Sequence, residues 1–197
     1  MIKVAVLVSG GGTNLQALID SEKQGGLLPG KLSLVISNKP GVKALDRAEK
    51  AGIPSLVVES AGISKEEFDA KMDAVLEENG IQVIVLAGFL RVLGSAFVKK
   101  YDRRIINVHP SLIPAFCGDG FYGLKVHEAA LAKGVKVTGA TVHFVNEITD
   151  GGEIILQKSV AIRKNDTAET LQRRVMEQAE WKLLPRALKM VCREYDK

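Results

Sequence analysis

The sequence predicts an α/β protein with a doubly wound, mostly parallel sheet and an antiparallel C-terminal strand extension. Two observations carry this prediction. Between residues 3 and 108, short β-branched apolar runs alternate with amphipathic runs, which is typical of parallel strands joined by crossover helices. After residue 120 this alternation ends, and two strand-like runs are joined only by the short turn "EITDGG", which indicates an antiparallel pair.

The individual elements follow from the local pattern. Parallel strands are expected where β-branched and other apolar residues dominate, at 3–8, 32–37, 54–59, 81–88 and 104–108. Helices are expected between them at 14–25, 44–52, 64–80 and 95–101, with a capping box formed by Ser64 and Glu67. Beyond residue 120 we expect a helix at 123–134, strands at 135–146 and 153–162, and one long helix at 167–192.

The composition is that of one globular domain covering residues 1–197. Apolar residues make up 46% of the chain and charged residues 25%, which argues against a disordered protein. The formal net charge is +4, but Lys and Arg are interspersed with Asp and Glu, so the chain has no basic tract typical of nucleic-acid binding. We therefore expect a small-molecule ligand, with neither a nucleic acid nor a membrane as partner.

The two cysteines and the N-terminus bear on the compartment. Cys117 and Cys192 form neither a disulfide framework nor a metal-binding spacing, so we expect reduced thiols and no metal site. The N-terminal run "IKVAVLV" lacks the basic segment and the cleavage site of a signal peptide. No apolar stretch approaches the roughly 20 residues that a membrane helix needs. The expected location is the cytoplasm.

The first polar loop after a strand is rich in glycine. Ligands of doubly wound sheets bind outside the carboxyl ends of the strands. There the sequence places "SGGGTN" (9–14), which opens a helix whose free N–H groups favour an anion. The dinucleotide fingerprint fails at its sixth position, Leu15, and no Gly-Lys-Ser/Thr follows. The loop therefore indicates a monophosphate site, with a plain tight turn as the alternative.

A second polar cluster follows the fifth strand, in "RIINVHPSLIPAF" (104–116). Asn107 and His109 lie two residues apart on a strand, so both side chains emerge on one face. An amide donor beside an imidazole can stabilise an oxyanion and move a proton. Asp150, in the turn "TDGG", is the expected carboxylate that orients the imidazole and raises its pKa. The alternative is a capped strand end with an exposed histidine and an unrelated aspartate.

Three other reactive side chains have more ordinary interpretations. His127 opens an amphipathic helix, and we expect it to be structural. His143 lies inside a strand, where a hydrogen-bonded core histidine is the usual case, although it could also line the site. Cys117 has no obvious base beside it, so we do not expect it to be a nucleophile.

Together these residues resemble the folate-dependent glycinamide ribonucleotide formyltransferases, also called phosphoribosylglycinamide formyltransferases. The resemblance covers the whole chain in the segments "VLVSGGGTNLQALI", "VIVLAGFLRVL", "INVHPSLIPAF", "VTGATVHFV", "TDGGEIILQ" and "VMEQAEWKLLP". The "NVHPSLIP" motif alone would mark only the wider formyltransferase group. The resemblance implies a Rossmann-like fold of the formyltransferase type, with a ribonucleotide-binding half at 1–100 and a catalytic and folate-binding half at 101–197.

The reaction that the resemblance implies is formyl transfer from the co-substrate 10-formyltetrahydrofolate to the amino group of glycinamide ribonucleotide, in purine biosynthesis. The amine attacks the formyl carbon, and protonated His109 with the Asn107 amide stabilises the tetrahedral oxyanion. Asp150 holds the imidazolium and assists proton movement. The chemistry needs neither a metal nor a covalent intermediate, and the protein is expected to be a monomer or homodimer.

The resemblance also implies two sets of binding residues. The ribonucleotide contacts are Gly11, Gly12, Thr13, Asn14, Leu15 and Glu180. The folate contacts are Lys65, Phe89, Leu90, Arg91, Val92, Asn107, Val145 and Asp150. Lys65 stands where the family often has an arginine near the folate's glutamate tail, so the charge is kept but the bidentate fork is lost. The loop beginning at Cys117 is longer than in some members, and a cis Ile113–Pro114 bond is implied.

Three alternatives remain open. Formyltetrahydrofolate deformylase resembles the same core and uses water in place of the amine, but it normally carries an additional N-terminal regulatory domain that we do not expect here. Methionyl-tRNA formyltransferase usually has a C-terminal tRNA-binding domain, which we also do not expect. A non-catalytic module that binds a phosphate ligand would explain "SGGGTN" without any need for Asn107, His109 and Asp150.

Overall fold

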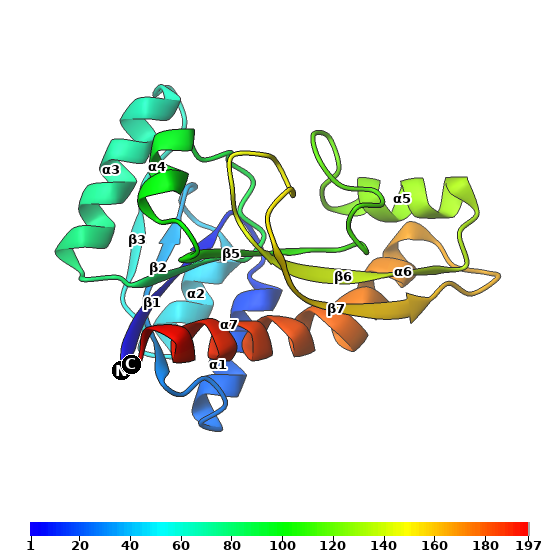
Figure 1. Cartoon of the computed structure of the whole chain (residues 1–197), viewed down its shortest axis with the longest axis horizontal. Coiled ribbons are helices and arrows are strands. Elements are labelled where there is room, and N and C mark those ends of the chain that lie inside the picture. The colour runs from blue at the N-terminus through cyan, green and yellow to red at the C-terminus, as the bar shows by residue number, and fades with distance from the viewer. Residues whose placement is uncertain (197) are drawn as a thin grey trace.

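The computed structural model describes residues 1–196, which form a seven-stranded sheet with helices on both faces. The strand order is β3-β2-β1-β4-β5-β6-β7, in which β1 to β5 pair in parallel. β6 and β7 join antiparallel at one edge, and in Figure 1 they extend to the right, away from the two chain ends. The predicted fold class, a doubly wound and mostly parallel sheet with an antiparallel extension, is confirmed.

The elements lie close to their predicted ranges. The parallel strands are β1 (Ile2–Val8), β2 (Gly30–Ser37), β3 (Ser55–Val57), β4 (Val83–Leu86) and β5 (Ile105–His109), and the antiparallel strands are β6 (Val137–Phe144) and β7 (Ile154–Ala161). The α-helices are α1 (Thr13–Lys23), α2 (Lys43–Lys50), α3 (Lys65–Glu78), α4 (Ser95–Lys100), α5 (Leu124–Lys133), α6 (Ala168–Val175) and α7 (Trp181–Tyr195).

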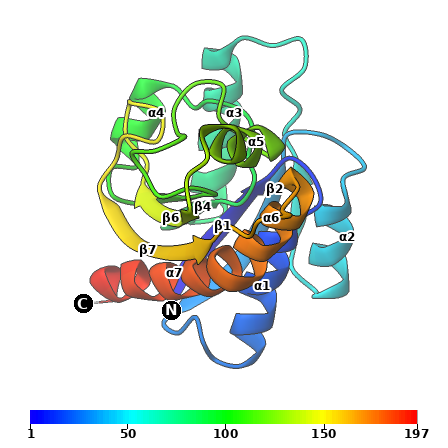
Figure 2. The same cartoon turned by 90° about the vertical axis from the view of Figure 1, so that its right-hand side faces the viewer.

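Alternate residues of β1 enter two separate cores. Val4 and Val6 pack into a core that includes residues of α1, α2, α6 and α7, whereas Ala5 and Leu7 pack into one that includes α3 and α4. All four side chains are fully buried, because a central parallel strand is covered on both faces. Figures 1 and 2 show α3 and α4 on one side of the sheet and α1 and α7 on the other.

The register of β5 against β6 determines which side chains meet at the carboxyl edge. Asn107 pairs with His143, and His109 pairs with Thr141. Directly opposite residues of an antiparallel pair project to the same face of the sheet. The antiparallel extension therefore brings His143 beside Asn107.

Two local features differ from the prediction. The long helix expected over 167–192 is interrupted by a π-helical segment, Met176–Glu180, which separates α6 from α7. At the start of α3 only half of the capping box forms, because the Ser64 hydroxyl accepts the Glu67 N–H at 3.0 Å while the Glu67 carboxylate pairs with Lys71 at 2.8 Å. A reciprocal box forms instead at the start of α6, between Thr167 and Thr170.

The sheet runs continuously through the two predicted halves of the chain, 1–100 and 101–197. β4 of the first half pairs directly with β5 of the second. The division into a ribonucleotide half and a folate half stays a prediction. Within residues 1–196 no helix combines the length and the apolar character needed to cross a membrane.

Candidate functional site

The loops that follow several parallel strands meet at the carboxyl edge of the sheet. Ser9, directly after β1, hydrogen-bonds both Asn38, directly after β2, and Leu90, on the loop after β4. His109 ends β5 at the same edge. This is the place where the doubly wound topology puts a ligand site.

The glycine loop is shaped by Gly12. Its φ is +70°, in the left-handed region, and a Cβ there would lie 2.7 Å from the Cβ of Ala44. Gly10 and Gly11 have open space around them, and no side chain caps α1, so the N–H groups of its first turn are available to a ligand. Arg47 of α2 holds the loop, with Nε 2.9 Å from the Gly11 carbonyl oxygen. The geometry fits the predicted phosphate site.

Asn14 and Glu180, both predicted ribonucleotide contacts, meet across the fold. Nδ2 of Asn14 donates to Oε2 of Glu180 at 2.7 Å, and both side chains are buried. Within residues 1–196 Oδ1 of Asn14 has no partner, so the pair keeps unused hydrogen-bonding capacity. Burial raises the pKa of Glu180 to about 7, against the opposing effect of the Asn14 donor. The side chain of Leu15 is fully buried in the core, which leaves only its backbone N–H for a ligand.

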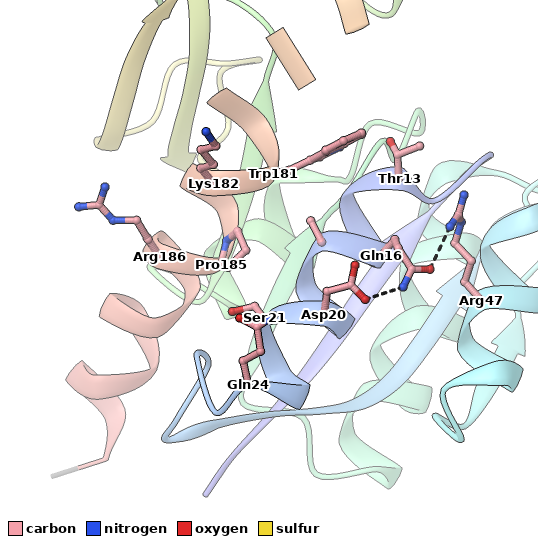
Figure 3. A pocket seen from close by; sticks show the side chains of 11 residues that line it. Thr13, Gln16, Asp20, Ser21, Gln24, Arg47, Trp181, Lys182, Pro185 and Arg186 are labelled. Atoms are coloured by element: carbon pink, nitrogen blue, oxygen red, sulfur yellow. Dashed lines mark hydrogen bonds between the residues drawn. The ribbon is translucent and has the colours of Figure 1, made fainter. Parts of the chain in front are cut away.

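A groove of about 490 Å³ lies beside the glycine loop, between α1 and α7. Its lining includes Thr13, Gln16, Asp20, Arg47, Trp181, Lys182 and Arg186. Figure 3 shows Gln16 hydrogen-bonded both to Asp20 and to Arg47, the residue that also holds the Gly11 carbonyl. Thr13 therefore lines an open groove whose charged residues are three cations and one carboxylate.

The predicted catalytic residues come together in one cluster. Nδ1 of His109 lies 3.4 Å from Oδ2 of Asp150. Nε2 of His109 lies 2.9 Å from the Phe116 carbonyl oxygen, which can only accept, so Nε2 carries a hydrogen. The Gly118 N–H donates to Oδ2 of Asp150 at 2.9 Å and fixes the carboxylate in place.

His143 joins Asn107 to this cluster. Its Nδ1 lies 2.8 Å from the Phe144 carbonyl oxygen and so carries a hydrogen. Its Nε2 lies 3.2 Å from Nδ2 of Asn107 and 3.6 Å from Oδ1 of Asp150. Sequence reasoning left His143 undecided. The signal that could have placed it is the strand register, which could not be known before the β5–β6 pairing.

Asp150 acts on the pKa of His109 in the predicted direction, but the net shift of that pKa is downward. Burial lowers the pKa of His109, and the opposing effects of the Asp150 charge and of the Phe116 carbonyl do not overcome it. Nδ1 of His109 faces the Asp150 carboxylate, so a proton placed on it would be held by an opposite charge. The sequence revealed the carboxylate but not the depth of the site, where the His109 side chain is only 5% exposed.

Asp150 is the charged member of the pair. Burial alone would raise the pKa of Asp150, but the contacts with His143, the Gly118 N–H and His109 together lower it below its usual value. A neutral imidazole beside a carboxylate can take up a proton and then hold it as an ion pair. The cluster thus has the chemistry of a proton acceptor that becomes an electrostatic stabiliser.

His127 and Cys117 lie close to the cluster. His127 is fully buried in α5 and, within residues 1–196, neither of its ring nitrogens has a partner; burial and nearby His109 lower its pKa to about 4. Burial and Asp150 raise the pKa of the Cys117 thiol, which does not favour the reactive thiolate. The part of the chain that the structure describes contains no group of three His, Cys, Asp or Glu side chains able to hold a metal ion.

Exposed apolar side chains lie on the two loops that carry predicted folate residues. Leu90 and Val92, on the loop after β4, are 58% and 61% exposed, and Ile148, on the loop between β6 and β7, is 69% exposed. Two other predicted folate residues lie near the first of these loops. Cε of Lys65 is 3.6 Å from the place where a Cβ would stand on Gly94. The centre of the Phe89 ring is 6.3 Å from the centre of the Phe68 ring. Apolar side chains beside a polar cluster suit a flat aromatic ligand.

Two predicted folate residues already use hydrogen-bonding groups within the protein. The Arg91 guanidinium donates to the carbonyl oxygens of Ser60 and Ser64, both at 3.0 Å, and lies 4.7 Å from the centre of the Phe68 ring. Val145 is half-buried against the core, and its N–H donates to the Ile105 carbonyl at 2.9 Å. For Arg91, the backbone rather than the guanidinium is free to contact a folate. The implied cis Ile113–Pro114 bond is present.

Comparison with known proteins identifies the family. Residues 2–188 match the family model described as formyl transferase. The crystal structure of glycinamide ribonucleotide transformylase 1 from Symbiobacterium toebii is 39% identical, with a TM-score of 0.91 and coverage of 98% of this chain and 89% of that one. The crystal structure of phosphoribosylglycinamide formyltransferase from Bacillus halodurans is 38% identical, with a TM-score of 0.89 and coverage of 98% and 97%.

A curated relative is much longer than this chain. The trifunctional purine biosynthetic protein adenosine-3 of Gallus gallus is 49% identical over 192 residues, which are 97% of this chain but 18% of that protein. The chain thus spans less than a fifth of this relative. Taken with the near-complete mutual match to the Bacillus halodurans structure, these likenesses place the chain in the formyl transferase family, among its phosphoribosylglycinamide formyltransferases.

Proposed function

We propose that this chain transfers the formyl group of 10-formyltetrahydrofolate to the amino group of glycinamide ribonucleotide, a reaction of purine biosynthesis. The observation that carries the proposal is the convergence of Asn107, His109, His143 and Asp150 at the carboxyl edge of the sheet. The likeness to the Bacillus halodurans phosphoribosylglycinamide formyltransferase, at 38% identity, supports the same activity.

The ribonucleotide binds along the glycine loop. Backbone N–H groups from Gly11 to Leu15 donate to its phosphate, because they lie at the N-terminus of α1 without a side-chain cap. Glu180 and the free Oδ1 of Asn14 accept hydrogen bonds from polar groups of the ribonucleotide. Thr13 and the cations of the neighbouring groove complement its negative charge.

The proton movements follow from the charge state of the cluster. The ribonucleotide amine attacks the formyl carbon, and the carbonyl π pair becomes an oxyanion. The proton that the attacking nitrogen must lose passes to the pair of His109 and Asp150, in which the carboxylate stabilises the imidazolium form of His109. The Asn107 amide and the His109 cation stabilise the oxyanion. The same proton is then available to the departing folate nitrogen as its bond to the formyl carbon breaks.

The folate co-substrate lies against the loop after β4 and the loop between β6 and β7. Leu90, Val92 and Ile148 offer it apolar surface, and backbone groups of Phe89 to Val92 other than the Leu90 N–H, which donates to Ser9, hydrogen-bond it. The positive charge of Lys65 suits the carboxylates of its glutamate tail. No covalent intermediate and no metal is required by this route. The cytoplasmic location and the state of monomer or homodimer stay predictions.

The test is release of tetrahydrofolate, followed with and without glycinamide ribonucleotide. We expect turnover only when the ribonucleotide is present. Turnover that does not depend on the ribonucleotide would replace the proposal with a water-using deformylase, and binding of the ribonucleotide without turnover would favour the non-catalytic module.

Single-site variants locate the activity. Asn107→Ala and His109→Ala are expected to lower kcat by about 10²–10³-fold, as loss of one oxyanion donor typically does. Asn79→Ala is the matched control: Asn79 caps α3 and its Nδ2 donates to the Val75 carbonyl at 2.8 Å, with no contact to the cluster. Equal activity of all three variants would place the reaction elsewhere.

A further inference from the structure

Four segments at the carboxyl edge, which follow β1, β2, β3 and β4, are joined by one directional chain of hydrogen bonds. The Leu90 N–H donates to Oγ of Ser9 at 2.9 Å. The Ser9 hydroxyl donates to Oδ1 of Asn38 at 2.6 Å, and Nδ2 of Asn38 donates to Oγ of Ser60 at 3.1 Å. Every donor points the same way along this chain, so each bond polarises the next.

Arg91 closes the chain into a ring. It follows Leu90 directly, and its guanidinium donates to the Ser60 carbonyl oxygen at 3.0 Å. We call the set of Ser9, Asn38, Ser60, Leu90 and Arg91 the Ser9 ring. The ring links the ends of β1 and β2 with the segment after β3 and the loop after β4.

The Ser9 hydroxyl cannot be replaced by an apolar group without loss. Ser9 is 6% exposed and Asn38 is 5% exposed, so water reaches neither side chain freely. The hydroxyl is at once an acceptor for Leu90 and a donor to Asn38. Its removal leaves a backbone N–H and an amide oxygen without their partners in a buried place.

The position of the ring gives it a role beyond packing. Ser9 is the first residue of the glycine loop, while Leu90 and Arg91 belong to the loop proposed to hold the folate. We propose that Ser9 is a positioning residue that couples the two substrate sites, so that binding of the ribonucleotide strengthens binding of the folate and the reverse. The proposal rests on the proposed function, because it takes both ligands from it.

The coupling arises because both ligands restrain the same ring. A ribonucleotide that fixes the glycine loop also fixes Ser9, and Ser9 then fixes the Leu90 N–H. The folate consequently meets a loop that is already ordered and loses less conformational freedom on binding. Linkage makes the effect reciprocal: each ligand must raise the affinity of the other by the same factor.

The experiment is calorimetric titration with glycinamide ribonucleotide and with tetrahydrofolate, which lacks the formyl group and cannot react. Each ligand is titrated alone and again in the presence of saturating amounts of the other. In the natural protein we expect the second ligand to bind roughly 5–50-fold tighter than alone, within the usual range of coupling between sites. In Ser9→Ala we expect this factor to fall to about 1–2.

Two further variants make the result specific to the ring. Ser33→Ala is the matched control, because the Ser33 hydroxyl bonds only the nearby Lys31 carbonyl, at 3.1 Å, on β2 outside the ring; it should keep the full coupling. Ser60→Ala removes the far end of the chain at a half-buried position and should lower the coupling factor without unfolding the protein. It keeps the proposal testable if Ser9→Ala does not fold.

A residue-level readout separates coupling from a general loss of stability. Hydrogen exchange of the Leu90 amide should slow when the ribonucleotide alone is added to the natural protein, and should not slow in Ser60→Ala or Ser9→Ala. Full coupling in the ring variants, or no coupling in the natural protein, would overturn the proposal. If neither ligand binds the natural protein, the proposed function itself fails, and that result is distinct from the loss of coupling alone.

Discussion

The two ring nitrogens of His109 face different partners, a carboxylate oxygen of Asp150 at 3.4 Å and the Phe116 carbonyl at 2.9 Å. Both favour the imidazolium, but burial is the larger effect and lowers the pKa of His109. The protonation state of His109 therefore depends on what enters the site, and a developing oxyanion would draw a proton onto it. A ring whose protonation responds in this way can accept the proton that the amine loses.

The pairing of His109 with Asp150 is tested by Asp150→Asn. Removing the carboxylate charge removes an effect that raises the pKa of His109, so the pKa of His109 should fall further below 6.5. NMR titration of the ring protons measures it. Asp119→Asn is the matched control, since Asp119 sits on the neighbouring loop and bonds Thr149 at 3.0 Å. An unchanged His109 titration in Asp150→Asn would refute the pairing.

The raised pKa of Glu180 leads us to expect that the stability of the protein depends on pH. Its pKa in the folded protein is about 7, against 4.5 for an ordinary glutamate, so between these values the folded state binds more protons than the unfolded state. Stability contributed by this group is complete below pH 4.5 and is lost as the pH rises to about 7. A difference of this size corresponds to about 3 kcal/mol.

Glu180→Gln should remove this dependence, because the amide stays neutral and still accepts from Asn14. Urea unfolding at pH 5 and pH 8 should show a smaller loss of stability in the variant than in the natural protein. Glu177→Gln, at an exposed position of the same π-helical segment, should keep the natural profile. Parallel profiles for the natural protein and Glu180→Gln would show that the carboxyl is not protonated in the folded state.

At the scale of single elements, the glycines of the glycine loop differ in what they are needed for. Gly12 is needed for the conformation of the loop, whereas Gly10 has open space around it. Gly12→Ala forces a Cβ to within 2.7 Å of Ala44 at a φ of +70°, so it should destabilise the fold by about 2 kcal/mol. Gly10→Ala, with open space around it, should change stability by less than about 0.5 kcal/mol. Thermal unfolding of the two variants compares them, and equal losses would contradict the explanation.

The parts of the structure that the sequence predicted are those that depend on local pattern. The run "VAVLV" predicts β1 because a strand covered on both faces is apolar at every position. The glycine loop, Asn107 and His109 were found because they directly follow such strands. Asp150 was placed only as the best available carboxylate, and the geometry brings it to His109.

The parts that the sequence did not predict depend on tertiary structure. His143 enters the site through the register of β6 against β5. The lowered pKa of His109 follows from burial of its side chain in the folded protein. The π-helical segment changes the helical repeat by a single wide turn, which leaves the apolar spacing of residues 167–192 almost unaltered.

Over the whole molecule, burial predicts a gradient of hydrogen exchange across the sheet. Every residue of β4 is buried, and β1 lies between β2 and β4 with both faces covered. By contrast β3 is an edge strand of three residues, all exposed. Amides of β1 and β4 should exchange only through global unfolding, whereas those of β3 should exchange through local opening. Exchange that is equally slow in all three strands would contradict this gradient.

The π-helical segment Met176–Glu180 also sets the angular phase between two helices. Each residue of an α-helix advances the side chains by about 100°, so a wide turn that takes in one extra residue rotates α7 about its axis relative to α6. Val175 of α6 and Leu183 of α7, one on each side of the segment, are both buried in the same core. Deleting one residue from the segment would turn the apolar stripe of α7 away from the sheet and carry Glu180 away from Asn14. The deletion would therefore change both the packing of α7 and the geometry of the site.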